Sequence, residues 1–388
     1  MDAQLQEFQN LFDKLSASKD EVTRKALLNI CRSQTGRLET PWETVWRMIM
    51  EPHQSAALRA ALEMGLIDAL ASSTTPLTST QLSEKTNCNE KLITRILRPL
   101  AVRHLVKEAS FETYTSSPVT SFLSQPGVAG GFKFMFDIAS RCTQQIPSFL
   151  AQDKFASPSP QGVFEHTFST PLPMFPWLQA HPNHMKDFGD LMMGQQMGRV
   201  PWFDVADVDQ VLFESKGGEK KDEVLLVDVG GGRGYDLQAF KTRFPDGDGK
   251  LVLQDLPMVV EDIQDLDEAV VRQVHDFFTP QPVRDAKAYY LRYILHDYSD
   301  EKCQEILKHI VDAMTPGYSK LLIFEWVLPD TESALFPSLL DINMMALLGG
   351  MERTQSQWKV LLEGAGLEVR RFWGEDKEAE SLIECVRK

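Results

Sequence analysis

A run of glycines that directly follows a short hydrophobic segment constrains the fold more than any other feature of this sequence. Residues 224–229 (VLLVDV) predict a buried strand, and residues 237–244 (LQAFKTRF) predict a helix a few positions later. Between them lie the glycines Gly230, Gly231, Gly232 and Gly234. Glycines let the backbone pass close to a ligand, and the N-terminus of a helix follows them. We therefore expect a strand–turn–helix unit that binds a nucleotide-like ligand.

The rest of the C-terminal half alternates predicted strands with predicted helices. The further strands are expected at residues 250–256, in a segment that ends near residue 275, and at residues 286–295, 319–328 and 380–388. Helices are expected between them, at residues 300–314 and 355–366. This order predicts an α/β fold with a twisted, mainly parallel sheet that is covered by helices on both faces.

Acidic residues stand at three successive strand ends. A glycine-rich first turn occurs in dinucleotide enzymes and in methyltransferases alike. The acidic residue Asp228 directly ahead of the glycines favours a methyltransferase. Asp255 lies about 20 residues past that turn, where an acid accepts hydrogen bonds from ribose hydroxyls. Asp276 is placed to accept from an adenine amino group, with Phe277 against the ring. Taken singly, Asp255 or Asp276 can also be a helix cap, but the three together predict a cofactor site.

His296 follows the predicted strand at residues 286–295, at the carboxyl edge of the sheet, where open α/β folds place ligands. A bound hydroxyl becomes a stronger nucleophile when a base takes its proton. A neutral imidazole within hydrogen-bonding reach can take the proton as the new bond forms, which typically contributes about 10²–10⁴-fold. A histidine at a strand end can equally be structural, so the neighbouring acids decide between the two interpretations.

Two acids follow at the next strand end and in the next loop. Glu325 ends the segment LLIFE, and Glu352 lies in GGMERT. Glu352 is a candidate to act on His296, and the alternatives are that it caps a helix or pairs with Arg353. Asp297, next to His296, is expected to cap the helix that starts near Ser299. No histidine or carboxylate cluster has the spacing of metal ligands along the chain, so we expect no metal.

Residues 126–215 are rich in aromatic residues, methionine, proline and glycine. Helices that are broken by such segments often line an apolar cavity, and methionine adapts to irregular ligands. Plain core packing explains the same composition equally well. We treat this segment as the expected substrate pocket of a domain at residues 126–388.

The N-terminal residues 1–125 predict a separate, mostly helical domain. Apolar residues recur at helical spacing through residues 1–70, and residues 79–115 predict a helix, a turn, a helix and a β-hairpin, the pattern of a winged helix. In isolation this motif suggests DNA reading. The second helix offers few basic residues, however, so we favour a packing or dimerisation module.

The charge of the chain excludes several classes of partner. Lys and Arg number 40 against 55 Asp and Glu, which gives a net charge of -15. Such a surface repels nucleic acid and anionic membranes. The 5 cysteines are scattered without a CxxC pair, and neither a signal peptide nor an apolar span is evident, which favours a cytoplasmic protein.

Five motifs in this order resemble those of the S-adenosylmethionine-dependent O-methyltransferases of the plant caffeic-acid and flavonoid type, and of their fungal secondary-metabolism branch. The motifs are LVDVGGGRG, LQDLP, LRYILHDYSDEKC, FEWVLPD and GGMERT. The resemblance implies a Rossmann-like, mainly parallel seven-stranded sheet behind a winged-helix dimerisation domain, and therefore a homodimer. It also implies that Glu325 and Glu352 flank His296 and fix its tautomer.

The resemblance further implies S-adenosyl-L-methionine as the cofactor. Arg292 stands where the family commonly has a lysine that contacts the cofactor. The expected cofactor-binding residues are Asp228, Gly230, Gly231, Gly232, Asp255, Leu256, Asp276, Phe277 and Arg292. The expected catalytic residues are His296, Glu325 and Glu352.

We therefore predict an O-methyltransferase that acts on a hydroxyl of a small aromatic or polyketide-like metabolite, with His296 as general base. The alternative is a pericyclase of the same family, which keeps the cofactor as a bound positive charge and catalyses dehydration or ring formation without methyl transfer. In that case the basic residues Lys133, Arg141 and Arg199 are candidates to polarise a carbonyl. A regulatory protein built on the winged helix is a third possibility, which the acidic charge disfavours.

Overall fold

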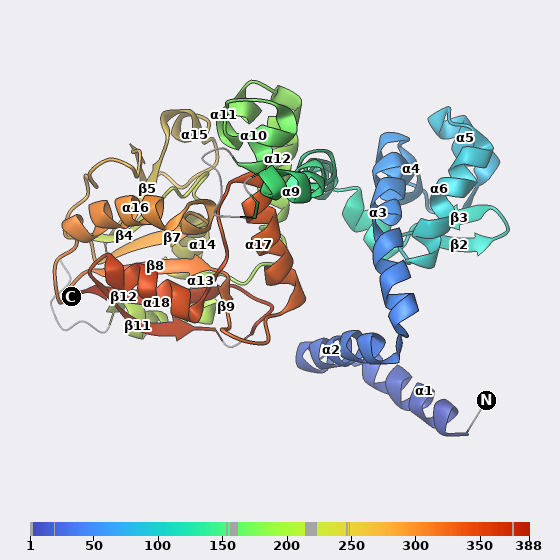
Figure 1. Ribbon diagram of the computed structural model, residues 1–388, viewed down its shortest axis with the longest axis horizontal. Helices are drawn as coiled ribbons and strands as arrows, with labels where there is room; N and C mark the ends of the chain where they lie inside the picture. Colours follow the sequence, from blue (N-terminus) through green and yellow to red (C-terminus); the bar gives the residue numbers. More distant parts are fainter. Residues whose placement is uncertain are drawn as a thin grey trace. The chain divides into compact units, whose positions relative to one another are not determined.

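The structure is a computed structural model that describes residues 3–388 apart from residues 19, 153, 156–161, 214–222, 246, 248 and 375. It divides into two compact units, Met1–Ala129 and Gly130–Lys388 (Figure 1). The predicted end of the pocket segment, residue 215, lies outside the described residues. Within the described residues, no helix combines the length and the apolar character that a membrane crossing requires.

Three long helices open the first unit: α1 (Ala3–Ser16), α2 (Glu21–Leu38) and α3 (Pro41–Glu63). At the start of α3, Thr40 forms a capping box with Glu43, which pairs otherwise free backbone N–H groups. No described residue of α1 or α2 is buried within one chain. Large apolar side chains stay exposed on the three helices, and these include Leu5, Phe8, Leu11, Trp42 and Trp46.

The winged helix predicted for residues 79–115 is present. Its helices are α5 (Ser79–Thr86) and α6 (Glu90–Val102), and its strands β1 (Leu77–Thr78), β2 (Lys107–Ser110) and β3 (Thr113–Thr115) form an antiparallel sheet in the order β1-β3-β2. Apolar residues of α6 and of α4 (Leu66–Ala71) are buried, among them Ile67, Leu70, Ile93 and Leu97. The small α7 (Pro118–Leu123) follows the wing.

A helical segment leads into the second unit. Its elements are α8 (Pro126–Phe134), the π-helical turn η1 (Met135–Ala139), α9 (Ser140–Gln152), α10 (Val163–Phe168), α11 (Met174–Gln179), α12 (Pro182–Gly194), α13 (Trp202–Val205) and the π-helical turn η2 (Asp209–Phe213). Phe134, Met174 and Trp177 are buried in its core, whereas Met192 and Met193 are exposed. Core packing therefore explains part of this composition, and the substrate pocket at residues 126–215 stays a prediction.

The second unit is built on a seven-stranded sheet in the order β11-β12-β8-β7-β4-β5-β6. Its strands are β4 (Val224–Val229), β5 (Lys250–Asp255), β6 (Val270–Val274), β7 (Ala288–Arg292), β8 (Lys320–Glu325), β11 (Leu367–Trp373) and β12 (Ser381–Arg387). The strands β6, β5, β4, β7 and β8 run parallel, and β12 pairs antiparallel with both β8 and β11. This confirms the expected Rossmann-like, mainly parallel sheet.

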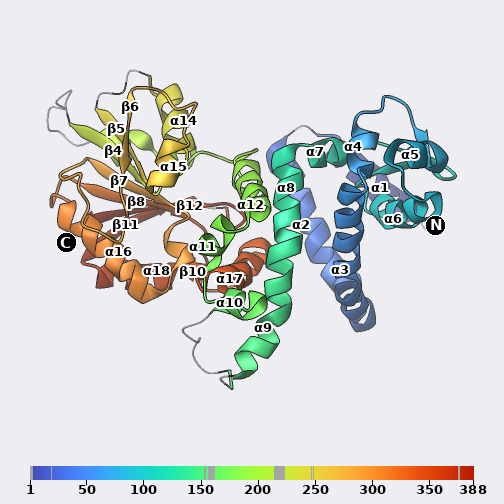
Figure 2. The same cartoon turned by 90° about the horizontal axis from the view of Figure 1, so that it is seen from above.

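Both faces of the sheet are buried by helices (Figure 2). One face packs against α16 (Asp300–Ala313) and α18 (Gln355–Gly364), and the other packs against α13 and α14 (Tyr235–Arg243). Neighbouring residues of one strand alternate between these cores, because successive side chains of a strand point to opposite faces. In β7, Tyr289 lies in the first core and Tyr290 in the second.

The strand order brings the motif residues to one edge. The carboxyl ends of β8, β7, β4 and β5 lie side by side, and the glycine turn follows β4 directly. The neighbouring strands β7 and β8 bring His296 and Glu325 together, although they are far apart in the sequence. Parallel sheets place ligands at this edge.

The loop at residues 348–352 lies against the same edge of the sheet. After α17 (Leu335–Leu347), the short β10 (Arg353–Thr354) pairs with β9 (Val327–Leu328), which anchors the loop at residues 348–352. The Met351 N–H donates to the backbone oxygen of His296 at 2.9 Å. A β-carbon on Gly350 would overlap that same oxygen, so only glycine fits here.

We predict that Gly350→Ala lowers the free energy of unfolding by about 2–4 kcal/mol, because two backbone segments have to move apart. The matched control is Gly349→Ala. Gly349 has a left-handed φ of 69° but open space around it, so this change costs only the conformational strain of about 1–2 kcal/mol. Urea unfolding of both variants measures the difference. Equal losses in the two variants would contradict the close approach.

Candidate active site

The glycine turn has one closed side and one open side. Gly230 and Gly231 donate their N–H groups to the backbone oxygen of Gln254, at 2.8 and 3.1 Å, which ties the turn to β5. Gly230 has a φ of 72°, and a β-carbon there would meet Ile294 at 2.7 Å. Gly232 has a φ of 60° with no protein atom near the position of a β-carbon. The backbone at Gly232 is therefore free to approach a ligand.

The support for this turn includes a buried amide pair that the sequence analysis missed. Gln254 and Gln281 exchange hydrogen bonds through their side-chain amides at 2.7 and 2.8 Å, and Gln254 also donates to Gln273 at 2.8 Å. A buried polar group needs such partners. A glutamine within a hydrophobic strand was the available signal. The pair fixes the residue whose carbonyl holds the glycines.

Asp255 uses both carboxylate oxygens on the backbone. One accepts from the N–H of Gly232 at 2.8 Å and the other from the N–H of Leu256 at 2.7 Å. Burial raises the pKa of Asp255 above its usual value, and the two N–H donors act in the opposite direction. Each oxygen keeps a lone pair for a further donor, because a carboxylate offers about four acceptor sites.

The residues that follow β6 also lie beside the glycine turn. Phe277 lies beside Gly230, with its ring 3.4 Å from the position of a β-carbon there. Asp276 is exposed, and its carboxylate accepts from the N–H of Phe278 at 3.0 Å. This contact closes a local turn, and no described helix begins there, so the helix-cap alternative does not hold for Asp276. Leu256 is 43% exposed at the mouth of the turn.

Asp228 is buried beneath the glycines. Its Oδ2 atom has no hydrogen-bond partner among the described residues. Burial first, and then the nearby charges of Asp236 and Asp255, raise the pKa of Asp228 well above its usual value. An unpaired buried carboxyl oxygen is costly, so it marks a place where a ligand with a donor group fits.

A network of charged side chains surrounds Asp228. Arg292, at the end of β7, donates to Glu380 at 3.0 Å and lies 3.9 Å from Asp236. Arg199 also pairs with Asp236, which accepts a further hydrogen bond from the hydroxyl of Tyr290 at 3.0 Å. Arg292, predicted as a cofactor contact, therefore already has protein partners.

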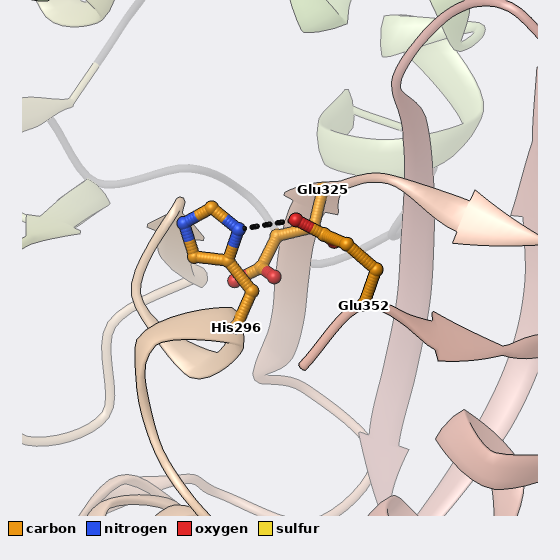
Figure 3. A group of neighbouring side chains, drawn as sticks. All are labelled: His296, Glu325 and Glu352. Carbon is orange, nitrogen blue, oxygen red and sulfur yellow. Dashed lines mark hydrogen bonds and ion pairs between the residues drawn. The ribbon is translucent and has the colours of Figure 1, made fainter. Parts of the chain in front are cut away.

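His296 lies in the single turn η3 (Leu295–Asp297) and is buried (Figure 3). Its Nδ1 atom lies 2.8 Å from a carboxylate oxygen of Glu352. Its Nε2 atom lies 3.3 Å from a carboxylate oxygen of Asp297. The sequence analysis expected Asp297 to cap the following helix, but the carboxylate instead faces the imidazole. Both ring nitrogens therefore have an acid beside them.

Glu325 holds the turn that carries His296. One carboxylate oxygen accepts from the N–H groups of Ile294 and Leu295, at 3.1 and 2.8 Å. Its other oxygen has no hydrogen-bond partner among the described residues. Glu325 is thus close to the imidazole but bonded to the backbone that precedes it.

Arg353 fixes the other side of this turn. It is fully buried, donates to the backbone oxygens of Leu295 and Tyr298 at 2.9 Å, and forms an ion pair with Asp300 at 2.8 Å. The alternative that Glu352 is the partner of Arg353 is therefore wrong, because Arg353 has Asp300. Glu352 is left for the imidazole.

The acids around His296 change its protonation. Burial alone lowers the pKa of His296, but the three surrounding carboxylates outweigh burial and raise it to about 9. Burial raises the pKa of Asp297 to about 7 and also raises the pKa of Glu325. The surrounding carboxylates therefore favour the protonated form of the imidazole.

The same three side chains form a possible donor set for a metal. One ligand atom from each of His296, Glu325 and Glu352 lies within 4.8 Å of the others. The sequence spacing gave no sign of this cluster, because its members come from three separate segments: the turn η3, the end of β8 and the loop before β10. The absence of a metal stays a prediction.

Each of the basic residues considered for the pericyclase alternative lies near another protein group. The guanidinium of Arg141 lies over the ring of Phe168, at 4.8 Å from its centroid. Lys133 lies near Asp187 and acts to lower the pKa of that acid, although burial raises it overall. Arg199 pairs with Asp236.

Two family models match the sequence. The O-methyltransferase domain matches residues 151–368, and the O-methyltransferase dimerisation domain matches residues 46–126. A curated relative from Aspergillus parasiticus, demethylsterigmatocystin 6-O-methyltransferase, is 36% identical over 96% of this chain and 95% of its own.

Solved structures with the same fold cover both units. One titled "A Pericyclic Reaction enzyme" matches 99% of both chains with a TM-score of 0.91 and 29% identity. Another, of LepI in complex with SAM, has a TM-score of 0.90 at the same identity and coverage. The chain belongs to the O-methyltransferase family of enzymes, whose cofactor is S-adenosylmethionine, and it carries the dimerisation domain of that family.

Proposed function

We propose that this enzyme transfers a methyl group from S-adenosylmethionine to a hydroxyl of a small aromatic or polyketide-like metabolite, with His296 as the general base. The observation that carries the proposal is the buried imidazole between Glu352 and Asp297, at the edge where the glycine turn opens. The relative that is named for 6-O-methylation of demethylsterigmatocystin supports a hydroxyl acceptor.

The residues at the glycine turn fit the cofactor. The unpaired oxygen of Asp228 suits an ammonium group, and the open side of Gly232 admits a ligand close to the backbone. Asp255 keeps acceptor capacity for ribose hydroxyls, and Phe277 presents a ring beside the turn. The bound cofactor supplies a methyl group on a positively charged sulfonium.

His296 handles the proton. With Nδ1–H donated to Glu352, the lone pair lies on Nε2, which takes the proton of the substrate hydroxyl as the C–O bond forms. The carboxylates of Glu352 and Asp297 stabilise the resulting imidazolium, and Glu325 keeps the turn in place. This is the same base-and-orienter arrangement that other enzymes use.

A second candidate is the pericyclase. It is favoured by the likeness to the pericyclic reaction enzyme and by the raised pKa of His296, which makes the imidazolium an available hydrogen-bond donor.

One assay separates the two candidate functions. Wild-type enzyme, cofactor and candidate phenols are incubated with EDTA, and S-adenosylhomocysteine and product mass are followed together. Methyl transfer gives one S-adenosylhomocysteine for each product that is heavier by one CH₂ group. Conversion without S-adenosylhomocysteine selects the pericyclase.

We predict that His296→Ala lowers kcat by about 10²–10⁴-fold, because the base acts only in the transition state. The affinities for cofactor and substrate should stay near those of the wild type. Glu352→Gln is the comparison, and it should lose less, since it disturbs only the orientation and charge of the ring. Steady-state kinetics and calorimetry measure both. Undiminished methyl transfer by a folded His296→Ala variant would remove His296 from the mechanism.

We predict that kcat/KM rises with pH and levels off near pH 9. The base must be neutral, so activity in the free enzyme increases as pH rises through the pKa of about 9. Replacing Glu352 by glutamine removes one of the carboxylates that raise this pKa, so its profile should level off at a lower pH. A pH–rate profile of both proteins measures this shift. Identical profiles would mean that Glu352 does not act on His296.

We predict that Asp255→Ala weakens the binding of S-adenosylmethionine by about 1–3 kcal/mol, because ribose hydroxyls and the N–H of Gly232 lose an acceptor. Asp255→Asn keeps one acceptor oxygen and should lose less. Isothermal calorimetry gives both affinities. Equal binding by wild type and by a folded Asp255→Ala protein would exclude this residue from the site.

We further propose that the chain is a homodimer whose interface lies largely within residues 1–125. The many exposed apolar side chains of α1, α2 and α3 support this, since large exposed apolar surfaces commonly mark protein–protein interfaces. Multi-angle light scattering at micromolar concentration should give twice the mass of 43.9 kDa. A stable monomer under these conditions would contradict the prediction.

A further inference from the structure

Tyr293 connects the charge network at the end of β7 to His296, and the mechanism above gives it no role. Its backbone has a φ of 52°, in the left-handed region. A bulky aromatic residue rarely adopts this conformation, and it persists only where the surroundings determine it. Such a residue at the edge of a site calls for an explanation in terms of what its ring contacts.

The ring of Tyr293 is held from several sides. The indole N–H of Trp326 donates to its hydroxyl at 3.1 Å. The guanidinium of Arg292 lies 4.2 Å from its ring centroid. Burial and the adjacent Glu380 raise the pKa of the hydroxyl, which therefore stays protonated. These contacts fix the ring independently of His296.

The face of this ring lies against the imidazole. The two ring centroids are 5.0 Å apart, and the planes differ by 13°. Glu352 and Asp297 contact the imidazole at its two nitrogens, so both act at its edge. Edge contacts alone leave the tilt of the ring plane poorly fixed, because the last torsion of histidine is broad. A flat surface against the face removes that freedom.

We propose that Tyr293 is a positioning residue that sets the plane of the His296 imidazole and so aims Nε2 at the reacting hydroxyl. This inference rests on the proposed role of His296 as the base. A misplacement of about 1 Å can cost on the order of 10²-fold in rate, so the loss of the stacking surface should lower kcat. The ring carries the effect, and the hydroxyl serves to anchor the ring.

The test compares Tyr293→Leu, which removes the ring, with Tyr293→Phe, which keeps it. Tyr293→Leu should lower kcat by about 10–100-fold while KM and cofactor affinity change less than about 2-fold. Tyr293→Phe should lose no more than about 3-fold. Tyr293→Gly removes the ring and suits the left-handed backbone, so it replaces Tyr293→Leu if that protein does not fold.

The matched control is Tyr289→Leu, which makes the same change in the buried core of β7, the strand that precedes Tyr293. It should lower stability but leave kcat near the wild-type value. A loss of kcat in Tyr289→Leu equal to that in Tyr293→Leu would overturn the proposal, because general destabilisation then explains both. So would an undiminished kcat in folded Tyr293→Leu.

A second readout does not depend on turnover. NMR titration of ¹³C-labelled histidine follows the protonation of His296 directly. Without the ring, the imidazole should contact its carboxylates less well, so its pKa should fall in Tyr293→Leu but not in Tyr293→Phe or Tyr289→Leu. An unchanged titration in Tyr293→Leu would overturn the proposal even if the wild type transferred no methyl group, whereas failure of methyl transfer alone contradicts only the proposed function.

Discussion

The placement of one buried imidazole among three carboxylates is the constraint on which the site depends. Taking such charges out of water is expensive unless each has a partner. The chain meets part of this requirement by bonding Glu352 to the ring and Glu325 to the backbone before it, while one carboxylate oxygen of each has no hydrogen-bond partner among the described residues. Arg353 then binds the carbonyls of the same turn, and Gly350 lets the loop at residues 348–352 approach. The turn that carries His296 is therefore held by bonds from β8 and from β10.

One strand, β7, links the glycine turn to the turn that carries His296. Strand β7 lies between β4, which carries the glycine turn, and β8, which ends in Glu325. Its last residue, Arg292, belongs to the charge network around Asp228. Tyr293 follows directly, and His296 comes shortly after it. The order of the parallel strands thus places the glycine turn and the turn that carries His296 at the same edge of the sheet.

The sequence predicted the parts of this site that local patterns encode. The glycine turn, the winged helix and the strand that ends in Asp255 follow from hydrophobic periodicity and from the residues next to it. The strand predicted for residues 286–295 ends earlier, at Arg292, and His296 lies in the turn η3 that follows. Contacts between distant segments were not predictable in this way. Arg353 was a possible partner of its neighbour Glu352. The buried guanidinium instead pairs with Asp300, which lies 53 positions away in the sequence. The stacking of Tyr293 depends on a left-handed backbone that no pattern indicated.

The most direct test is the protonation of His296 in the wild-type protein. Histidine labelled with ¹³C is titrated by NMR, and the signal that disappears in His296→Asn identifies this residue among the 8 histidines. A pKa near 9, reduced in Glu352→Gln, is the predicted result, because the surrounding carboxylates outweigh burial. A pKa at or below the usual 6.5 would contradict the account, since it would mean that the carboxylates do not act on the ring.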